Sequence, residues 1–157
     1  MNEATTNIVN TVLPSASINE ISMTWLLVIA AFAIMFSLLE AWIATLIIYV
    51  KIDALKKIFP VPHNLIRSHI DYLLMSLLLV AIYFVCLHLN ISLPKSIIII
   101  LLIGALYNPF GFFIQAINPK AGKNDTFAGK LGVCLGFLPT TIGYSYSAFI
   151  IMKTLVT

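Results

Sequence analysis

The chain has 157 residues, of which 61% are hydrophobic and only 10% carry a charge. Soluble domains contain about 45–50% apolar residues, so this composition excludes an ordinary soluble domain and predicts an integral membrane protein. The formal net charge of +3 comes almost entirely from expected loops, and no basic patch for nucleic acid is present. Both cysteines, Cys86 and Cys134, lie within apolar segments. We interpret them as small buried apolar residues, because they suggest neither a disulfide framework nor a zinc site.

Four apolar segments are long enough to cross a bilayer, which needs about 20 residues per helix. Because little sequence remains outside them, they predict an all-α, integral membrane four-helix bundle that forms a single transmembrane domain over residues 1–157. Residues 1–22 contain no Lys or Arg, so a cleaved signal peptide is not expected. The expected helices span residues 23–50, 67–89, 96–117 and 126–156.

Basic residues cluster in two of the expected loops. Seven of the nine Lys and Arg residues lie in loops 51–67 and 118–130. By the positive-inside rule both loops are cytoplasmic and both termini lie outside. We therefore expect a multi-pass protein of a bacterial-type inner (cell) membrane.

Glu40 lies well inside the first expected helix, 11 residues before Lys51. An ionised carboxylate at that depth costs several kcal/mol unless it is protonated or paired, so it is a functional candidate. The alternative is a protonated carboxyl bonded to a neighbouring helix, through a tyrosine or the broken turn at Asn108.

Ionisable residues are concentrated at the expected start of the second helix, where Arg67, His69 and Asp71 lie within five positions. In a chain with so few charges, this spacing favours a binding site over scattered surface charge. Asp71 points about 200° away from His69 on a helix, so it is expected to be a first-turn carboxylate favoured by the helix dipole or a salt-bridge partner of a loop lysine, and not a catalytic partner of His69. One polar stripe of this helix comprises His69, Tyr72, Ser76 and Tyr83.

A neutral imidazole such as His69 is a good ligand for haem iron and first-row metals. The alternative is an interfacial histidine bonded to a lipid headgroup or a backbone carbonyl. His88 lies about 30 Å away by helical rise, so the two histidines cannot share one metal. His63 is expected to be solvated.

Two prolines, Pro109 and Pro139, lie inside the third and fourth expected helices. Each removes one backbone hydrogen bond, and such breaks survive in a bilayer only where protein or water satisfies the backbone. Kinks are therefore expected at both prolines. Asp125 or Thr126 is the expected N-cap of the fourth helix.

Asn108, an amide in the third helix, needs partners inside the membrane. Either it lines a polar pocket or it makes interhelical hydrogen bonds, worth about 0.6 kcal/mol each. In the fourth helix, Gly132 and Gly136 form a small-xxx-small pattern that predicts a close contact, with another helix of this chain or with a second subunit. The residues that would share the pocket are Tyr107, Gln115, Thr140, Thr141, Tyr144 and Tyr146.

The order of these motifs resembles the styrene oxide isomerase family and its membrane relatives, including hydroxylaminobenzene mutases. The resemblance covers about residues 64–151, and it implies a haem b held by His69 between the subunits of a homotrimer. It further implies that ferric iron acts as a Lewis acid on a small apolar epoxide, which isomerises to an aldehyde. The motifs are Arg67-Ser68-His69, Asn108-Pro109-Phe110-Gly111-Phe112-Phe113, Asn118-Pro119 and Leu138-Pro139. With His69 as the metal ligand, the implied cofactor-binding residues are Arg67, His69, Tyr72, Ser76, Phe112 and Phe113.

The chain departs from the family pattern where polar groups would position an epoxide. The family isomerase has an asparagine where this chain has Met75, an aspartate that aligns with Gly104, and a tyrosine that aligns with Phe112 or Phe113. Losing such groups elsewhere reduces rates by orders of magnitude. The haem site is therefore expected to persist while the reaction differs or is absent. The weak catalytic candidates are Asn108, Glu40 and Tyr72.

Two other functions remain open from the sequence. Glu40 would suit a small four-helix transporter, although no surrounding motif supports it. The glycine pattern would suit a non-catalytic accessory subunit that packs on a partner protein.

Overall fold

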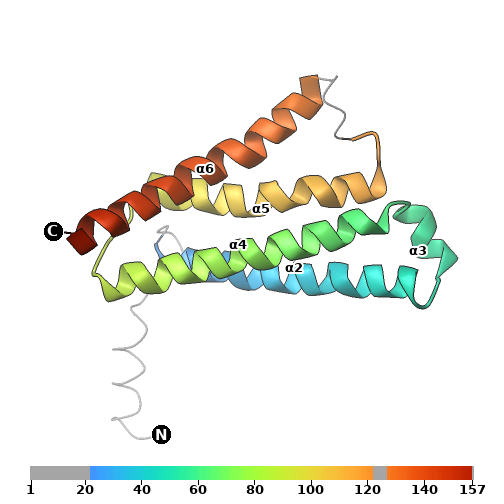
Figure 1. The fold of residues 1–157 in the computed structure, drawn as a ribbon, viewed down its shortest axis with the longest axis horizontal. Helices are drawn as coiled ribbons and strands as arrows, with labels where there is room; N and C mark the ends of the chain where they lie inside the picture. The colour runs from blue at the N-terminus through green and yellow to red at the C-terminus, as the bar shows by residue number, and fades with distance from the viewer. Residues whose placement is uncertain (1–21, 122–126, 157) are drawn as a thin grey trace, which may run out of the picture.

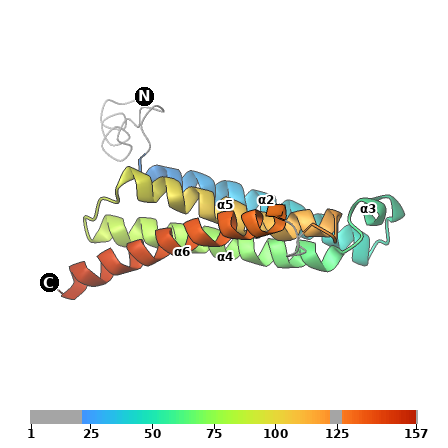
Figure 2. The same cartoon turned by 90° about the horizontal axis from the view of Figure 1, so that it is seen from above.

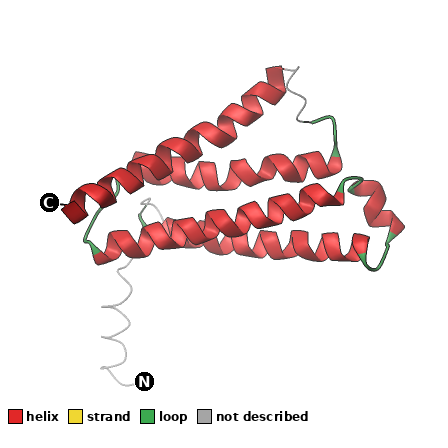
Figure 3. Ribbon diagram, viewed as in Figure 1, coloured by secondary structure: helices red, strands yellow, loops and turns green. Residues whose placement is uncertain are grey.

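The computed structural model describes residues 22–121 and 127–156, and within these ranges the chain is helical, with no strand (Figure 3). Four helices are long and apolar enough to cross a bilayer, and a short helix connects the first two (Figure 1). The protein is therefore a multi-pass, all-α membrane bundle in contact with lipid, and the fold class predicted from the sequence is confirmed. The helices are α2 (Thr24–Ile48), α3 (Asp53–Ile58), α4 (Pro62–His88), α5 (Lys95–Ile117) and α6 (Phe127–Val156).

Helices α2, α4 and α5 form the centre of the bundle, and α6 lies at its edge. α2 and α4 pack along each other and α5 packs on both, whereas α6 packs on α5 and only slightly on α4. In Figure 1 the C-terminal part of α6 lies against α5, and its N-terminal part leans away. A site shared by α2, α4 and α5 therefore lies away from α6.

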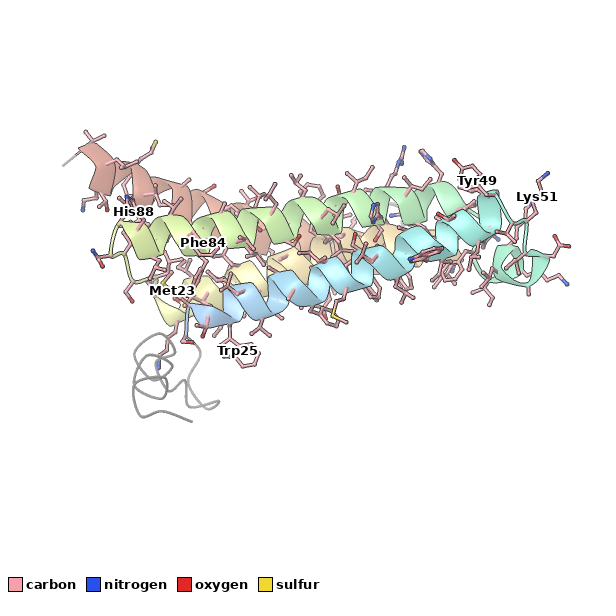
Figure 4. All side chains as sticks on the ribbon, turned by 90° about the horizontal axis from the view of Figure 1, so that it is seen from below. Met23, Trp25, Tyr49, Lys51, Phe84 and His88 are labelled. Atoms are coloured by element: carbon pink, nitrogen blue, oxygen red, sulfur yellow. The ribbon has the colours of Figure 1, made fainter. Side chains whose placement is uncertain are left out.

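The connections between helices gather at the two ends of the bundle. Figure 4 shows Met23 and His88 near one end and Tyr49 and Lys51 near the other, next to α3. The start of α2 and the end of α6 lie at the same end (Figure 2). The α3 end is tied to α5 because the backbone N–H of Val61 donates to Ala116 O at 3.4 Å.

Helix α4 begins at Pro62, five residues before the expected start at Arg67. A proline at the first position of a helix loses no hydrogen bond, because the first N–H groups have no partner within the helix. Its fixed φ also suits a helix start, so Pro62 begins the helix that it was expected to precede. His69 consequently lies about 10 Å from the start of α4, and not in its first turn.

The other boundaries lie within two residues of expectation. α2 ends at Ile48 and the chain turns through Lys51, which has a left-handed conformation (φ 58°). α5 and α6 each continue as one helix through Pro109 and Pro139. The expected N-cap at Asp125 or Thr126 lies outside the described residues.

The buried interior consists of two apolar clusters with a polar layer between them. One cluster surrounds Leu79 and Leu101, and the other surrounds Leu65 and Ala116 near the α3 end. Between them, buried polar residues replace apolar ones on the facing sides of α2 and α4. This polar layer comprises Ser37 and Glu40 of α2 and Ser68, His69 and Tyr72 of α4.

Candidate functional site

The polar layer contains His69 and Glu40, the strongest candidate residues of the sequence. α2 and α4 run in opposite directions, and Ser37 of α2 lies opposite His69 of α4. Phe36 of α2 packs edge-on against Tyr72 of α4, with ring centroids 5.1 Å apart. Glu40 follows Ser37 by three residues and so lies on the same face of α2. His69 and Glu40 are therefore two parts of one interhelical layer.

The His69 ring is fixed by Ser37 through its Nδ1 atom. Nδ1 lies 2.9 Å from Ser37 O and 2.6 Å from Ser37 Oγ, and Ser37 Oγ donates to His69 O at 3.1 Å. A backbone oxygen only accepts hydrogen bonds, so Nδ1 must carry the proton. The neutral ring then has the tautomer in which Nε2 holds a lone pair.

Nε2 is the atom of His69 that remains open to a ligand. Among the described residues no hydrogen bond reaches it, and it is not one of the buried polar atoms that lack a partner. The side chain as a whole is half-buried. The half-buried ring therefore has one nitrogen, Nε2, whose lone pair none of the described hydrogen bonds uses.

Glu40 has the opposite environment. It is 0% exposed, and neither carboxyl oxygen has a hydrogen-bond partner in the part of the chain that the structure describes. An unpartnered charge inside a bilayer costs several kcal/mol, so this geometry favours the neutral acid. The expected bond from this carboxyl to a tyrosine or to the turn at Asn108 is not formed.

Ser68 lies beside the Glu40 carboxyl, but Ser68 and Tyr72 both donate their hydroxyl protons to α5. Ser68 Oγ donates to Pro109 O at 3.1 Å, and Tyr72 Oη donates to Leu106 O at 3.0 Å. Each hydroxyl has a single proton, so neither proton is available to the carboxyl. These two bonds join α4 to α5 at the proline of α5.

The remaining cofactor-binding candidates are not gathered around Nε2. Arg67 is exposed, and Ser76 donates within its own helix, to Leu73 O at 2.8 Å. Phe112 is half-buried, and Phe113 packs against Phe36, Phe59 and Phe110 with centroid distances of 5.3, 5.9 and 5.7 Å. The aromatic cluster of Phe36, Phe59, Phe110 and Phe113 fills space between α2 and α5.

The polar residues around Asn108 do not converge on one pocket. Asn108 is half-buried and its backbone faces Gly136 of α6, where an added Cβ would lie 3.4 Å from Asn108 Cα. Thr140 and Thr141 each donate to a carbonyl of α6 itself. Tyr144 Oη reaches Met75 O at 3.4 Å. Three members of this set, Thr140, Thr141 and Tyr144, therefore bond to helix backbone.

Two departures from the family pattern have a structural explanation. Met75 is buried in the apolar cluster around Leu79. An added Cβ at Gly104 would lie 2.7 Å from the backbone N of Thr140. An aspartate cannot occupy position 104 unless α6 moves away from α5.

The sequence analysis missed the two serines that organise the layer, Ser37 and Ser68. Both are fully buried, and each bonds across a helix interface. A signal for Ser37 was present, because Ser37 and Glu40 have the spacing of one helical face within an otherwise apolar segment. Ser68 adjoins His69 and was named only as part of a motif.

No protein-family model, curated protein or solved structure matches the chain. Its function must therefore be argued from the polar layer itself. Within the described residues, no group of three or more His, Cys, Asp or Glu side chains lies close enough to hold a metal ion. A haem iron needs only one protein nitrogen, because the porphyrin supplies four, and His69 Nε2 fits that requirement.

Proposed function

We propose that this membrane protein binds haem b, with His69 Nε2 as the protein ligand to the iron. The observation that carries the proposal is the bond from His69 Nδ1–H to Ser37 O, together with an Nε2 lone pair that none of the described hydrogen bonds uses. Histidines that ligate metals almost always donate their other ring N–H to a carboxylate, carbonyl or water. This contact fixes the tautomer and the ring orientation before a ligand binds.

Ser37 supports the ligand through its backbone as well as its hydroxyl. A carbonyl that accepts from Nδ1–H raises the basicity of Nε2 and so strengthens its bond to iron. Because the acceptor at 2.9 Å is a main-chain oxygen, the contact depends on the packing of α2 against α4. Ser37→Ala keeps this oxygen and is expected to keep the haem.

A homotrimer, as the family resemblance implies, would enclose the haem. The aromatic cluster occupies the space between α2 and α5, so a macrocycle on Nε2 would lie against the outer surface of the chain, where lipid or another subunit can cover it. The proposed location is a bacterial-type inner membrane. The basic residues of loops 51–67 and 118–130 favour a cytoplasmic location for the α3 end.

Bound haem would supply a Lewis-acidic iron with one open coordination position. The residues of this chain support binding of a small apolar ligand there better than isomerisation of an epoxide. Met75 and Gly104 offer no polar group, and the Tyr72 hydroxyl is engaged by Leu106 O at 3.0 Å. We therefore propose haem binding as the primary function and epoxide isomerisation as a weak activity or none.

The test is the absorption spectrum of the detergent-purified full chain, oxidised and reduced, after expression with ample haem. We expect a Soret band that is lost in His69→Ala and kept in His88→Ala, because His88 is exposed near the opposite end of α4. A colourless wild-type protein, or a band that survives His69→Ala, refutes the proposal. The reaction is tested separately by following conversion of styrene oxide to its aldehyde with the haem-loaded protein.

One observation favours a second function, a small transporter that uses Glu40. Its carboxyl is buried without a partner inside the bundle, and membrane-embedded carboxyls commonly mark proton or ion pathways. Proton-coupled uptake by vesicles that contain the protein, abolished by Glu40→Gln, would support this function. Uptake that persists in Glu40→Gln would refute the transporter function.

A further inference from the structure

Glu40 is a buried acid in a position that the proposed haem site does not use. Both carboxyl oxygens lack a hydrogen-bond partner among the described residues, and the side chain is 0% exposed. Buried polar groups in proteins are nearly always hydrogen-bonded, so an orphaned carboxyl calls for an explanation. Apolar clusters lie on both sides of the polar layer that contains this carboxyl.

The hydroxyl group of Ser68 lies beside this carboxyl, and its proton is directed to another acceptor. Ser68 and Tyr72 donate to Pro109 O and Leu106 O of α5 at 3.1 and 3.0 Å. A hydroxyl rotates readily about its C–O bond, so its proton can move from a carbonyl to a neighbouring carboxylate. Hydrogen bonds to a charged acceptor are about twice as strong as those to a neutral one. An ionised Glu40 would therefore compete with α5 for the Ser68 donor.

We propose that Glu40 is a reversible proton-binding site whose protonation state controls the contact between α4 and α5. With the proton bound, the neutral acid leaves Ser68 and Tyr72 on the α5 carbonyls, as observed. When the proton leaves, the Ser68 hydroxyl turns to the carboxylate and releases Pro109 O. The ligand of this site is one proton, and the response is a looser contact between α4 and α5 beside Pro109.

Among the described residues, no cation lies within hydrogen-bonding distance of the Glu40 carboxyl to replace the proton. From Ser96 to Ile117, α5 has no charged residue. Lys95, at the start of α5, lies about 20 Å along the helix from Pro109. The charged residues of α3 lie beyond the end of the bundle, and α6 packs on α5. The other ionisable residues of α4 near this layer are Arg67, which is exposed, and His69 and Asp71, which are half-buried.

Dicyclohexylcarbodiimide tests the proposal, because this lipid-soluble reagent modifies protonated carboxyl groups inside membranes. The purified full chain is treated at acid, neutral and alkaline pH, and the modified residue is identified by peptide mass. We expect modification at Glu40 that falls as the pH rises and that is absent in Glu40→Gln. Modification that is equal at every pH, or that misses Glu40 at acid pH, overturns the proposal.

Two serines of α4 provide a matched comparison. Ser68→Ala removes a donor to the carboxylate, so modification of Glu40 at alkaline pH is expected to rise by about tenfold. Ser76→Ala removes a hydroxyl that bonds only within α4 and is expected to leave modification unchanged. Ser68→Cys, whose thiol is only a weak donor, gives the same test if Ser68→Ala does not fold. Equal effects of Ser68→Ala and Ser76→Ala overturn the proposal.

Two further measurements separate this site from its alternatives. Protection of Glu40 by excess sodium or lithium chloride at constant pH would show a metal cation as the ligand and overturn the proton assignment. The labelling is repeated in His69→Ala, where it is expected to be unchanged. A variant that loses the Soret band but keeps normal labelling of Glu40, or keeps the band but loses the labelling, shows that the haem site and the proton site are independent of each other.

Discussion

Gly104→Ala should weaken the packing of α6 on α5, because this glycine is where the two backbones approach most closely among the glycines that the structure describes. An added Cβ would lie 2.7 Å from Thr140 N and 2.8 Å from Thr140 Cα. Carbon contacts are most favourable at about 3.5–4.0 Å, so α6 would have to move by about 1 Å. Overpacking of this kind costs about 1–3 kcal/mol.

Two other glycines make the expected effect specific. An added Cβ at Gly111, on the same helix, meets nothing within 4 Å, and alanine gains about 1 kcal/mol of helix propensity over glycine. Gly111→Ala should therefore be neutral or slightly stabilising. At Gly143 the nearest atoms, at 2.9 and 3.0 Å, belong to the Leu101 side chain, which can rotate, so Gly143→Ala should have an intermediate effect.

The assay is equilibrium unfolding of the purified protein by SDS in mixed micelles, followed by circular dichroism. We expect Gly104→Ala to lower the free energy of unfolding by about 1–3 kcal/mol relative to Gly111→Ala. Adding Thr140→Ala should not restore stability, because the clash includes the Thr140 backbone. Equal stability of Gly104→Ala and Gly111→Ala would refute the close contact between α5 and α6.

Three further substitutions test the polar layer and the topology. Glu40→Leu should raise the free energy of unfolding by about 1–3 kcal/mol in the same assay, because it removes a buried polar group that has no partner; a loss of stability would mean that the carboxyl has one. Tyr72→Phe should cost about 1 kcal/mol by removing the bond to Leu106 O, whereas Tyr107→Phe, at a side chain that is 55% exposed, should cost nothing measurable. Lys56→Cys should react with an impermeant maleimide only in opened cells, and Ser92→Cys, in the α4–α5 connection, should react in intact cells; the opposite pattern would invert the assigned topology.

Much of the fold could be predicted from the sequence, because each membrane span is decided locally. A run of about 20 apolar residues is removed from water as a helix whatever its neighbours are, so the four spans were found to within a few residues. The boundary at Pro62 was missed because a proline both ends one helix and suits the first turn of another. Which role applies depends on the chain before it, where α3 and Phe59 pack at the end of the bundle.

The chemistry of single residues was also visible in the sequence, whereas their partners were not. Glu40 and His69 stand out because an ionisable group in a long apolar segment is costly wherever the segment lies. Nothing local places Ser37 opposite His69 or directs Ser68 to Pro109 O, because these contacts join residues 32 and 41 positions apart. They depend on how each helix is rotated about its own axis.

The same physical reason separates the glycines. Gly104 and Gly111 look equivalent in the sequence, yet only Gly104 faces another backbone. The sequence by itself determined that four helices cross a membrane and that the carboxyl of Glu40 and the imidazole of His69 stand out within them. Only the tertiary structure decided that one of these groups has a ring nitrogen that none of the described hydrogen bonds uses and the other a carboxyl without a partner, because helix rotation is set by packing along the whole bundle.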